Sequence, residues 1–194
     1  MERILSIVLP AIPETLIMVG VSSLIAVIVG LPLGILLYAT QQGGLSDNPT
    51  VYKILDGFVN VFRSLPFAVL MLLVMPLTKL LIGRRIGTTA SIVPLTVTAI
   101  HFNGLNKGII EAAKAMGSDT NIIVKKVVLK ESLPQIIATV TMTIINLVGQ
   151  SAIVGLIGGG GLGDIALRYG YSRNQMDILW AACIAIILLV QLVQ

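Results

Sequence analysis

The sequence contains few charged residues, and this scarcity excludes an ordinary soluble domain. Only 11% of the 194 residues are Asp, Glu, Lys or Arg, whereas soluble globular domains carry about 25%. Hydrophobic residues make up 56% of the chain. Because a helix that crosses a bilayer needs about 20 apolar residues, the chain has room for about five spans. We therefore predict an all-α, polytopic integral membrane protein in which residues 1–194 form a single transmembrane domain.

Cysteine and recognisable catalytic motifs are scarce as well. The single cysteine, Cys183, lies in an apolar run, so one chain cannot build a disulfide framework or a metal cluster. The phosphate-binding pattern Gly-x-x-x-x-Gly-Lys-Ser/Thr does not occur, and no nucleophile–base pair is recognisable. We predict no catalytic residue, no metal site and no cofactor in this chain. Residues 1–13 lack the basic start and short apolar core of a signal peptide, so we expect the first span to be retained.

Five apolar segments follow one another along the chain, separated by polar connections. They cover residues 15–40, 56–82, 89–102, 133–157 and 178–194. Pro32 predicts a kink in the first segment, and Pro66 and Pro76 interrupt the second. Bilayer helices tolerate proline where neighbours satisfy the freed backbone groups. Turn-forming residues predict loops at 41–53 and 83–88, and residues 158–177 form a glycine-rich connection.

The basic residues indicate cytoplasmic loops but do not fix the orientation. A net charge of +4 in a membrane protein is more typical of cytoplasmic loops than of nucleic-acid binding, and we predict no nucleic-acid partner. Five spans would divide the 13 basic residues almost evenly between the two sides. The positive-inside rule therefore leaves the topology open.

The one long charged stretch, residues 103–132, carries a helical pattern of its own. Ile109, Ala113 and Met116 recur at helical spacing. Gly117 follows them, and glycine accepts the positive φ of a sharp bend at the end of a helix. A second apolar set comes after the glycine. The pattern predicts two short amphipathic helices outside the bilayer, which lie on the membrane surface, pack on their own bundle or enter a groove on a partner.

The residues around this glycine form a pattern that is known from one superfamily. Glu111-Ala112-Ala113 is followed, after three residues, by Gly117 and later by Val127 and Leu129. This resembles the "EAA" loop of ABC importer permeases, in which the loop forms coupling helices seated in a cleft of a cytoplasmic ATPase. The family pattern ends in proline, where this chain has Lys130. The resemblance implies an ATPase-coupling role for Glu111, Ala112, Ala113, Met116 and Gly117.

Other segments resemble one subfamily, the methionine-type permeases of type I ABC importers. They are residues 63–67 (RSLPF), 92–96 (IVPLT) and, as the most specific, 147–177. The connection between Ile100 and Gly108 is shorter than in that family. The resemblance implies five spans in the bacterial cytoplasmic (inner) membrane, surrounded by lipid, with residues 103–132 in the cytoplasm.

The same resemblance implies an assembly and a function. The assembly is a homodimer of this chain with two cytoplasmic ABC ATPase subunits, which bind ATP-Mg, and an external substrate-binding lipoprotein. Its function is methionine import by alternating access. A permease for another small polar solute and a secondary carrier are the alternatives. Against a proton-driven carrier, we expect Glu14 and Asp56 near span ends rather than mid-span.

Polar residues of the fourth segment are the candidates for the solute pathway. Asn146 and Gln150 are one helical turn apart, and Ser151 follows directly. Such side chains also hydrogen-bond neighbouring helices within the bilayer, so this alternative stays open.

The glycine run after the fourth segment is a candidate gate or hinge, because a glycine-rich segment can bend. It comprises Gly158, Gly159, Gly160 and Gly161. The alternative is a helix end followed by a plain loop. Gly155 and Gly159 have the small-xxx-small spacing that permits close contact between helices.

Overall fold

A computed structural model describes residues 2–42, 46–100 and 133–194, and every regular element in these ranges is a helix. This confirms the all-α fold class. The five predicted ATPase-coupling residues lie in 101–132, outside the described residues. The helices are α1 (Glu2–Thr40), α2 (Pro49–Ser64), α3 (Phe67–Ile82), α4 (Thr88–Ala99), α8 (Leu133–Leu156), α9 (Gly161–Ile165), the π-helix η2 (Ala166–Tyr171) and α10 (Met176–Val193).

Helix α1 is longer than the sequence predicts. It has 39 residues, which at 1.5 Å per residue is about 58 Å, nearly twice the hydrocarbon thickness of a bilayer. The predicted start at residue 15 is wrong, because the helix runs through Pro10 and Pro13. Its first turns are held by tertiary contacts: Val8 is buried together with Leu162 of α9.

The predicted apolar segments all occur as helices, in the expected order. By length and composition, α1, α8 and α10 each suffice to cross a membrane. The pair α2 and α3 passes the same test only jointly, and α4 is a shorter apolar helix. Five membrane crossings remain a prediction.

The second segment bends by 114° between α2 and α3. Proline disfavours helical geometry in the residue before it, and Leu65 and Pro66 are both extended, with ψ of 132° and 138°. Pro66 therefore breaks the segment as predicted, whereas Pro76 lies inside α3. At the other end of α2, Asn48 caps the helix by accepting a hydrogen bond of 3.2 Å from the Val51 N–H.

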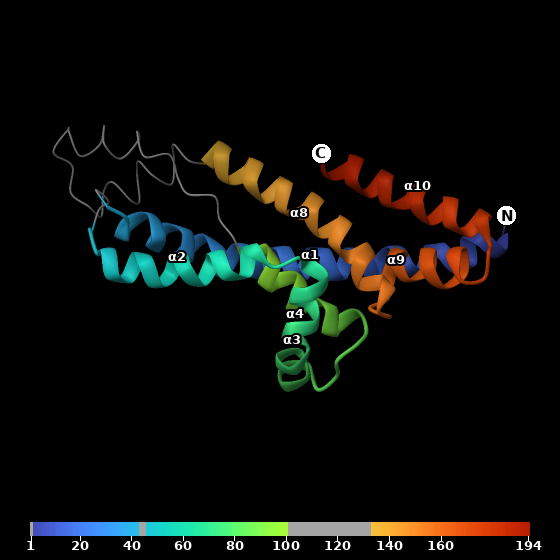
Figure 1. Ribbon diagram of the computed structural model, residues 1–194. Coiled ribbons are helices and arrows are strands. Elements are labelled where there is room, and N and C mark those ends of the chain that lie inside the picture. The colour runs from blue at the N-terminus through green and yellow to red at the C-terminus, as the bar shows by residue number, and fades with distance from the viewer. Residues whose placement is uncertain (1, 43–45, 101–132) are drawn as a thin grey trace.

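Two apolar clusters hold the helices together, and α1 contributes to both. The first includes the fully buried Met18 of α1, Leu95 of α4 and Leu147 of α8. The second joins the beginning of α1 to α9 and α10. In Figure 1, α1 accordingly runs the length of the molecule beneath α8 and α10, while α3 and α4 project to one side.

The glycine-rich connection, residues 158–177, is mostly helical, which the sequence analysis did not predict. Only its first residues form a turn, after which α9 and η2 continue the chain as far as Tyr171. Leu162 and Ile165 are buried among residues of α1 and α10. This burial stabilises a helix where composition alone predicts none.

Candidate functional site

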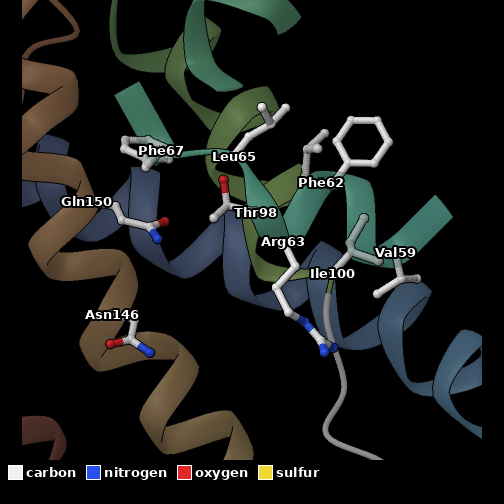
Figure 2. Close-up of a pocket in the computed structure, with 10 residues that line it drawn as sticks. Val59, Phe62, Arg63, Leu65, Phe67, Thr98, Ile100, Asn146 and Gln150 are labelled. Atoms are coloured by element: carbon white, nitrogen blue, oxygen red, sulfur yellow. The ribbon is translucent and has the colours of Figure 1, made fainter. Parts of the chain in front are cut away.

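A partly open cavity of about 280 Å³ lies at the bend between α2 and α3 (Figure 2). Residues of α4 and α8 complete its wall. Its polar lining consists of Arg63, Thr98, Asn146 and Gln150. Its apolar lining consists of Val59, Phe62, Leu65, Phe67, Val97 and Ile100. The cavity is therefore amphiphilic, and it joins residues that are up to 91 positions apart, from Val59 to Gln150.

Helix α8 brings two of the three predicted pathway residues to this cavity. Asn146 and Gln150, one turn apart, lie on the same side of the helix in Figure 2. Ser151 is not among the lining residues, because the next residue in a helix points about 100° away. Ser151 is buried, and its hydroxyl donates a 2.7 Å hydrogen bond to the Val148 carbonyl.

The amide of Gln150 is incompletely satisfied. Its Oε1 atom is buried and has no hydrogen-bond partner among the described residues. A buried acceptor without a partner costs about 1–3 kcal/mol. Thr98 differs, because its hydroxyl donates a 2.8 Å hydrogen bond to the Pro94 carbonyl. Within the described residues, the fold thus uses the hydroxyl of Thr98 and leaves an acceptor of Gln150 without a partner.

Arg63 is a site residue that the sequence analysis did not select. It lies in the last turn of α2 and forms no ion pair within the described ranges, whereas Arg168 pairs with Asp164 at 2.9 Å. The available signal is its position directly before Ser64-Leu65-Pro66, where proline ends the helix. The bend carries the end of α2 to the edge of the cavity (Figure 2).

The glycine run, the second candidate site, is fixed to the interior of α1. The Gly161 N–H donates to Oε2 of Glu14 at 2.7 Å, and the Leu162 N–H donates to Oγ1 of Thr15 at 2.9 Å. Both N–H groups belong to the first turn of α9, where a helix has no internal acceptors for them. Glu14 lies well inside α1, and its predicted place near the end of a membrane span stays a prediction. The separation of 147 positions explains why no local signal reveals this contact.

Close packing explains why glycine occupies these positions. Gly158, Gly160 and Gly161 have φ of +80°, +84° and +75°, a region that residues with a Cβ avoid. A Cβ on Gly161 would lie 2.6 Å from Oγ1 of Thr15, and one on Gly159 would lie 2.7 Å from Oγ of Ser91. Gly159, Gly160 and Gly161 are therefore enclosed by α1 and α4, whereas Gly158 is exposed. The role of the four glycines as a gate or hinge stays a prediction.

The expected close helix contact at Gly155 is present. A Cβ there would overlap the backbone of Gly163 and Asp164 at the start of α9. We call the region formed by Glu14, Thr15, Gly155 and residues 158–163 the glycine junction.

A family model describes the chain over most of its length. Residues 30–193 match the model for the inner membrane component of binding-protein-dependent transport systems. The chain belongs to this family. It is thus a permease component of a transport system, as its helices and its resemblance to importer permeases predicted.

Individual relatives agree with this membership. The permease is 42% identical to the probable D-methionine transport system permease protein MetI of Vibrio cholerae, over 97% of its own length and 88% of the relative. It is 39% identical to the methionine import system permease protein MetP of Bacillus subtilis, over 82% and 76% of the two chains.

Solved structures share the fold. One chain from inward-facing conformations of the MetNI methionine ABC transporter superposes with a TM-score of 0.92 and 38% identity, over 100% of this permease and 94% of that chain. A chain of an amino acid ABC transporter with histidines gives a TM-score of 0.75 at 18% identity, which supports the fold alone. The architecture is that of an ABC importer permease.

Proposed function

We propose that this permease forms the translocation path for methionine in an ATP-driven bacterial importer. The observation that carries the proposal is the agreement of two comparisons over nearly the whole chain. The relative that is 42% identical is named for D-methionine transport, and the backbone with a TM-score of 0.92 belongs to a methionine ABC transporter. The agreement covers 97–100% of this chain.

The working assembly is a homodimer of this permease in the cytoplasmic (inner) membrane, with two ABC ATPase subunits inside and a substrate-binding lipoprotein outside. Large apolar side chains on its surface support contact with lipid and a second copy. Leu80 is 81% exposed and Leu192 is 84% exposed, and exposed apolar surface of this kind marks an interface or a membrane. The cavity is also partly open, and a two-fold copy adds a second wall.

The permease itself breaks no covalent bond. The partner ATPases bind and hydrolyse ATP-Mg, and residues 103–132 transmit their closure through Glu111, Ala112, Ala113, Met116 and Gly117. The motion alternates access to the pathway between the two sides of the membrane. Asn146 and Gln150 face the solute during passage, with Ser151 on α8 beside them. Residues 158–161 of the glycine junction serve as the gate or hinge.

Copurification and vesicle transport test this proposal. The permease is coexpressed with a tagged ABC ATPase, extracted in detergent and reconstituted with the binding protein. We expect copurification of the ATPase and methionine uptake only with ATP. Uptake without the ATPase would favour a secondary carrier. Stimulation of ATP hydrolysis by another amino acid, and not by methionine, would favour a permease for a different solute.

A single substitution tests the coupling role of residues 103–132. We expect Gly117→Val to lower solute-stimulated ATPase activity and uptake, because valine resists the positive φ of a sharp bend. Membrane expression should match that of Gly149→Ala, whose added Cβ meets no atom within 4 Å. Unchanged uptake by Gly117→Val would contradict the coupling role.

A further inference from the structure

Helices α1, α8 and α10 enclose a second, smaller hollow, which we call the spanning-helix groove. It has a volume of about 130 Å³ and is partly open. Each of its three helices is by itself long and apolar enough to cross a membrane. In a bilayer, such helices are surrounded by lipid hydrocarbon and by other spanning helices. The wall of the groove includes Val19 and Gly20 of α1, Ile144 and Val148 of α8, and Leu189 and Leu192 of α10.

The side chains of the groove offer little polarity to a ligand. Its lining contains two hydroxyls, Thr15 and Ser23, and the fold already uses both as donors. Thr15 donates to the Ala11 carbonyl and Ser23 to the Gly20 carbonyl, each at 3.0 Å. The cavity at the α2–α3 bend differs, because Gln150 has a buried acceptor there without a partner among the described residues. The groove therefore suits an apolar ligand.

Helix α8 separates the groove from the cavity at the bend. Ile144 and Val148 line the groove, whereas Asn146 and Gln150 line the cavity. The two pairs are offset by two residues, which in an α-helix is a rotation of about 200°. The groove thus lies on nearly the opposite side of α8, and a ligand bound in it does not occupy the cavity.

The surface of α1 at the groove favours a flexible chain over a second helix. A Cβ added to Gly20 would meet no atom within 4 Å, so the wall is open at this residue. Helices that pack closely in membranes place small residues one turn apart. One turn on either side of Gly20, α1 carries Leu16 and Leu24, which are 51% and 61% exposed. These leucines prevent close contact with another backbone, whereas a hydrocarbon chain is thin enough to enter between them.

We propose that the spanning-helix groove binds an acyl chain of a membrane phospholipid. The chain fills the open space at Gly20 and contacts the apolar walls supplied by α1, α8 and α10. Filling this space is favourable because an empty groove forfeits the dispersion attraction of the atoms that line it. The inference requires only that the permease lies in a membrane, and it holds for any transported solute.

Mass spectrometry of the intact protein tests binding. The permease, with the partners that copurify, is extracted in a mild detergent and washed until bulk lipid is removed. We expect the wild type to retain phospholipid and Gly20→Leu to lose it, because the leucine side chain fills the open space. The matched control is Gly149→Leu on α8, where an added Cβ also meets no atom within 4 Å but which lies outside the lining. A wild type without phospholipid, or equal retention by Gly20→Leu, would overturn the proposal.

Two further measurements separate loss of lipid from loss of fold. Both leucine variants gain the same helix propensity, and we expect their thermal unfolding and size-exclusion profiles to match. Gly20→Ala adds only a methyl group and should lower lipid retention by less than Gly20→Leu does. A graded loss in correctly folded protein is the expected result, and full retention by both Gly20 variants contradicts it.

Photochemical labelling in intact membranes identifies what fills the groove. Leu189, half-buried in the wall, is replaced by a diazirine amino acid of similar size. We expect irradiation to attach phospholipid to α10, with a lower yield when Gly20→Leu is added and an unchanged yield with Gly149→Leu. An equal yield in both variants would place the lipid outside the groove. A cross-link between two permease chains in place of the lipid adduct would show that a second copy fills it, and either result overturns the proposal.

Discussion

The cavity and the glycine junction share α8, yet they treat polar groups in opposite ways. At the junction, the N–H groups of Gly161 and Leu162 find acceptors on α1. No space remains there for a Cβ on Gly155 or Gly161. At the cavity, Gln150 has a buried acceptor without a described partner. Natural proteins commonly sacrifice stability at sites that must bind a ligand. The difference indicates that the junction stabilises the fold, and it supports the proposal that the polar groups of the cavity face the solute.

The largest effect is expected at the junction, from Gly155→Val. A side chain there would overlap the backbone of α9, which cannot move aside as a flexible side chain can. We expect a loss of more than about 4 kcal/mol in the free energy of unfolding. Thermal unfolding and size-exclusion profiles of the detergent-extracted protein measure it. Gly149→Ala on the same helix is the control. Wild-type behaviour of Gly155→Val would show that α8 and α9 are not in close contact.

An intermediate effect is expected from the contact between α1 and α9. Glu14→Ala leaves the Gly161 N–H without its 2.7 Å acceptor, and we expect a cost of about 1–3 kcal/mol. Glu14→Gln keeps a carbonyl oxygen at the same place and should cost less. Both are measured as shifts in the midpoint of thermal unfolding. If the alanine variant is as stable as the wild type, this hydrogen bond does not hold the junction.

The smallest effect on stability is expected at the cavity. Gln150→Leu replaces an unpaired buried acceptor by an apolar group of similar size, a change that is nearly neutral or stabilising. We expect the free energy of unfolding to change by less than about 1 kcal/mol while methionine uptake falls. Thermal unfolding measures the expected small change in stability, and vesicle uptake on the same preparation measures the expected loss of transport. A large loss of stability would show that Gln150 serves the fold, and the contrast with the junction would disappear.

Local patterns predicted the helices and part of the site. Apolar runs located five helical segments, since helix length follows from the thickness of the bilayer. The one-turn spacing of Asn146 and Gln150 predicted that both face the same way, and both line the cavity. Ser151 follows directly in sequence, but a helix turns it to another face. The sequence analysis grouped Ser151 with Asn146 and Gln150 and did not take account of this change of helix face.

Long-range contacts explain what local patterns did not predict. The first turns of α1 were missed because Pro10 and Pro13 disfavour a helix, while burial of Val8 with Leu162 stabilises it. The helical part of 158–177 was missed because glycine lowers helix propensity, and its stabilising contacts come from α1 and α10. Glu14 gains its role through the N–H of the distant Gly161, and Arg63 lines a cavity whose opposite wall comes from α4 and α8.

The sequence by itself determined a helical membrane permease, since its hydrophobicity, the EAA pattern and the spacing of polar residues on α8 are all local properties. Only the tertiary structure decided which polar groups are satisfied. The hydrogen bond of Glu14 depends on the packing of α9 on α1. The surroundings of Gln150, which offer its Oε1 no partner among the described residues, depend on the 114° bend between α2 and α3. Such contacts join residues 147 positions apart, a separation at which the sequence pattern carries no local signal.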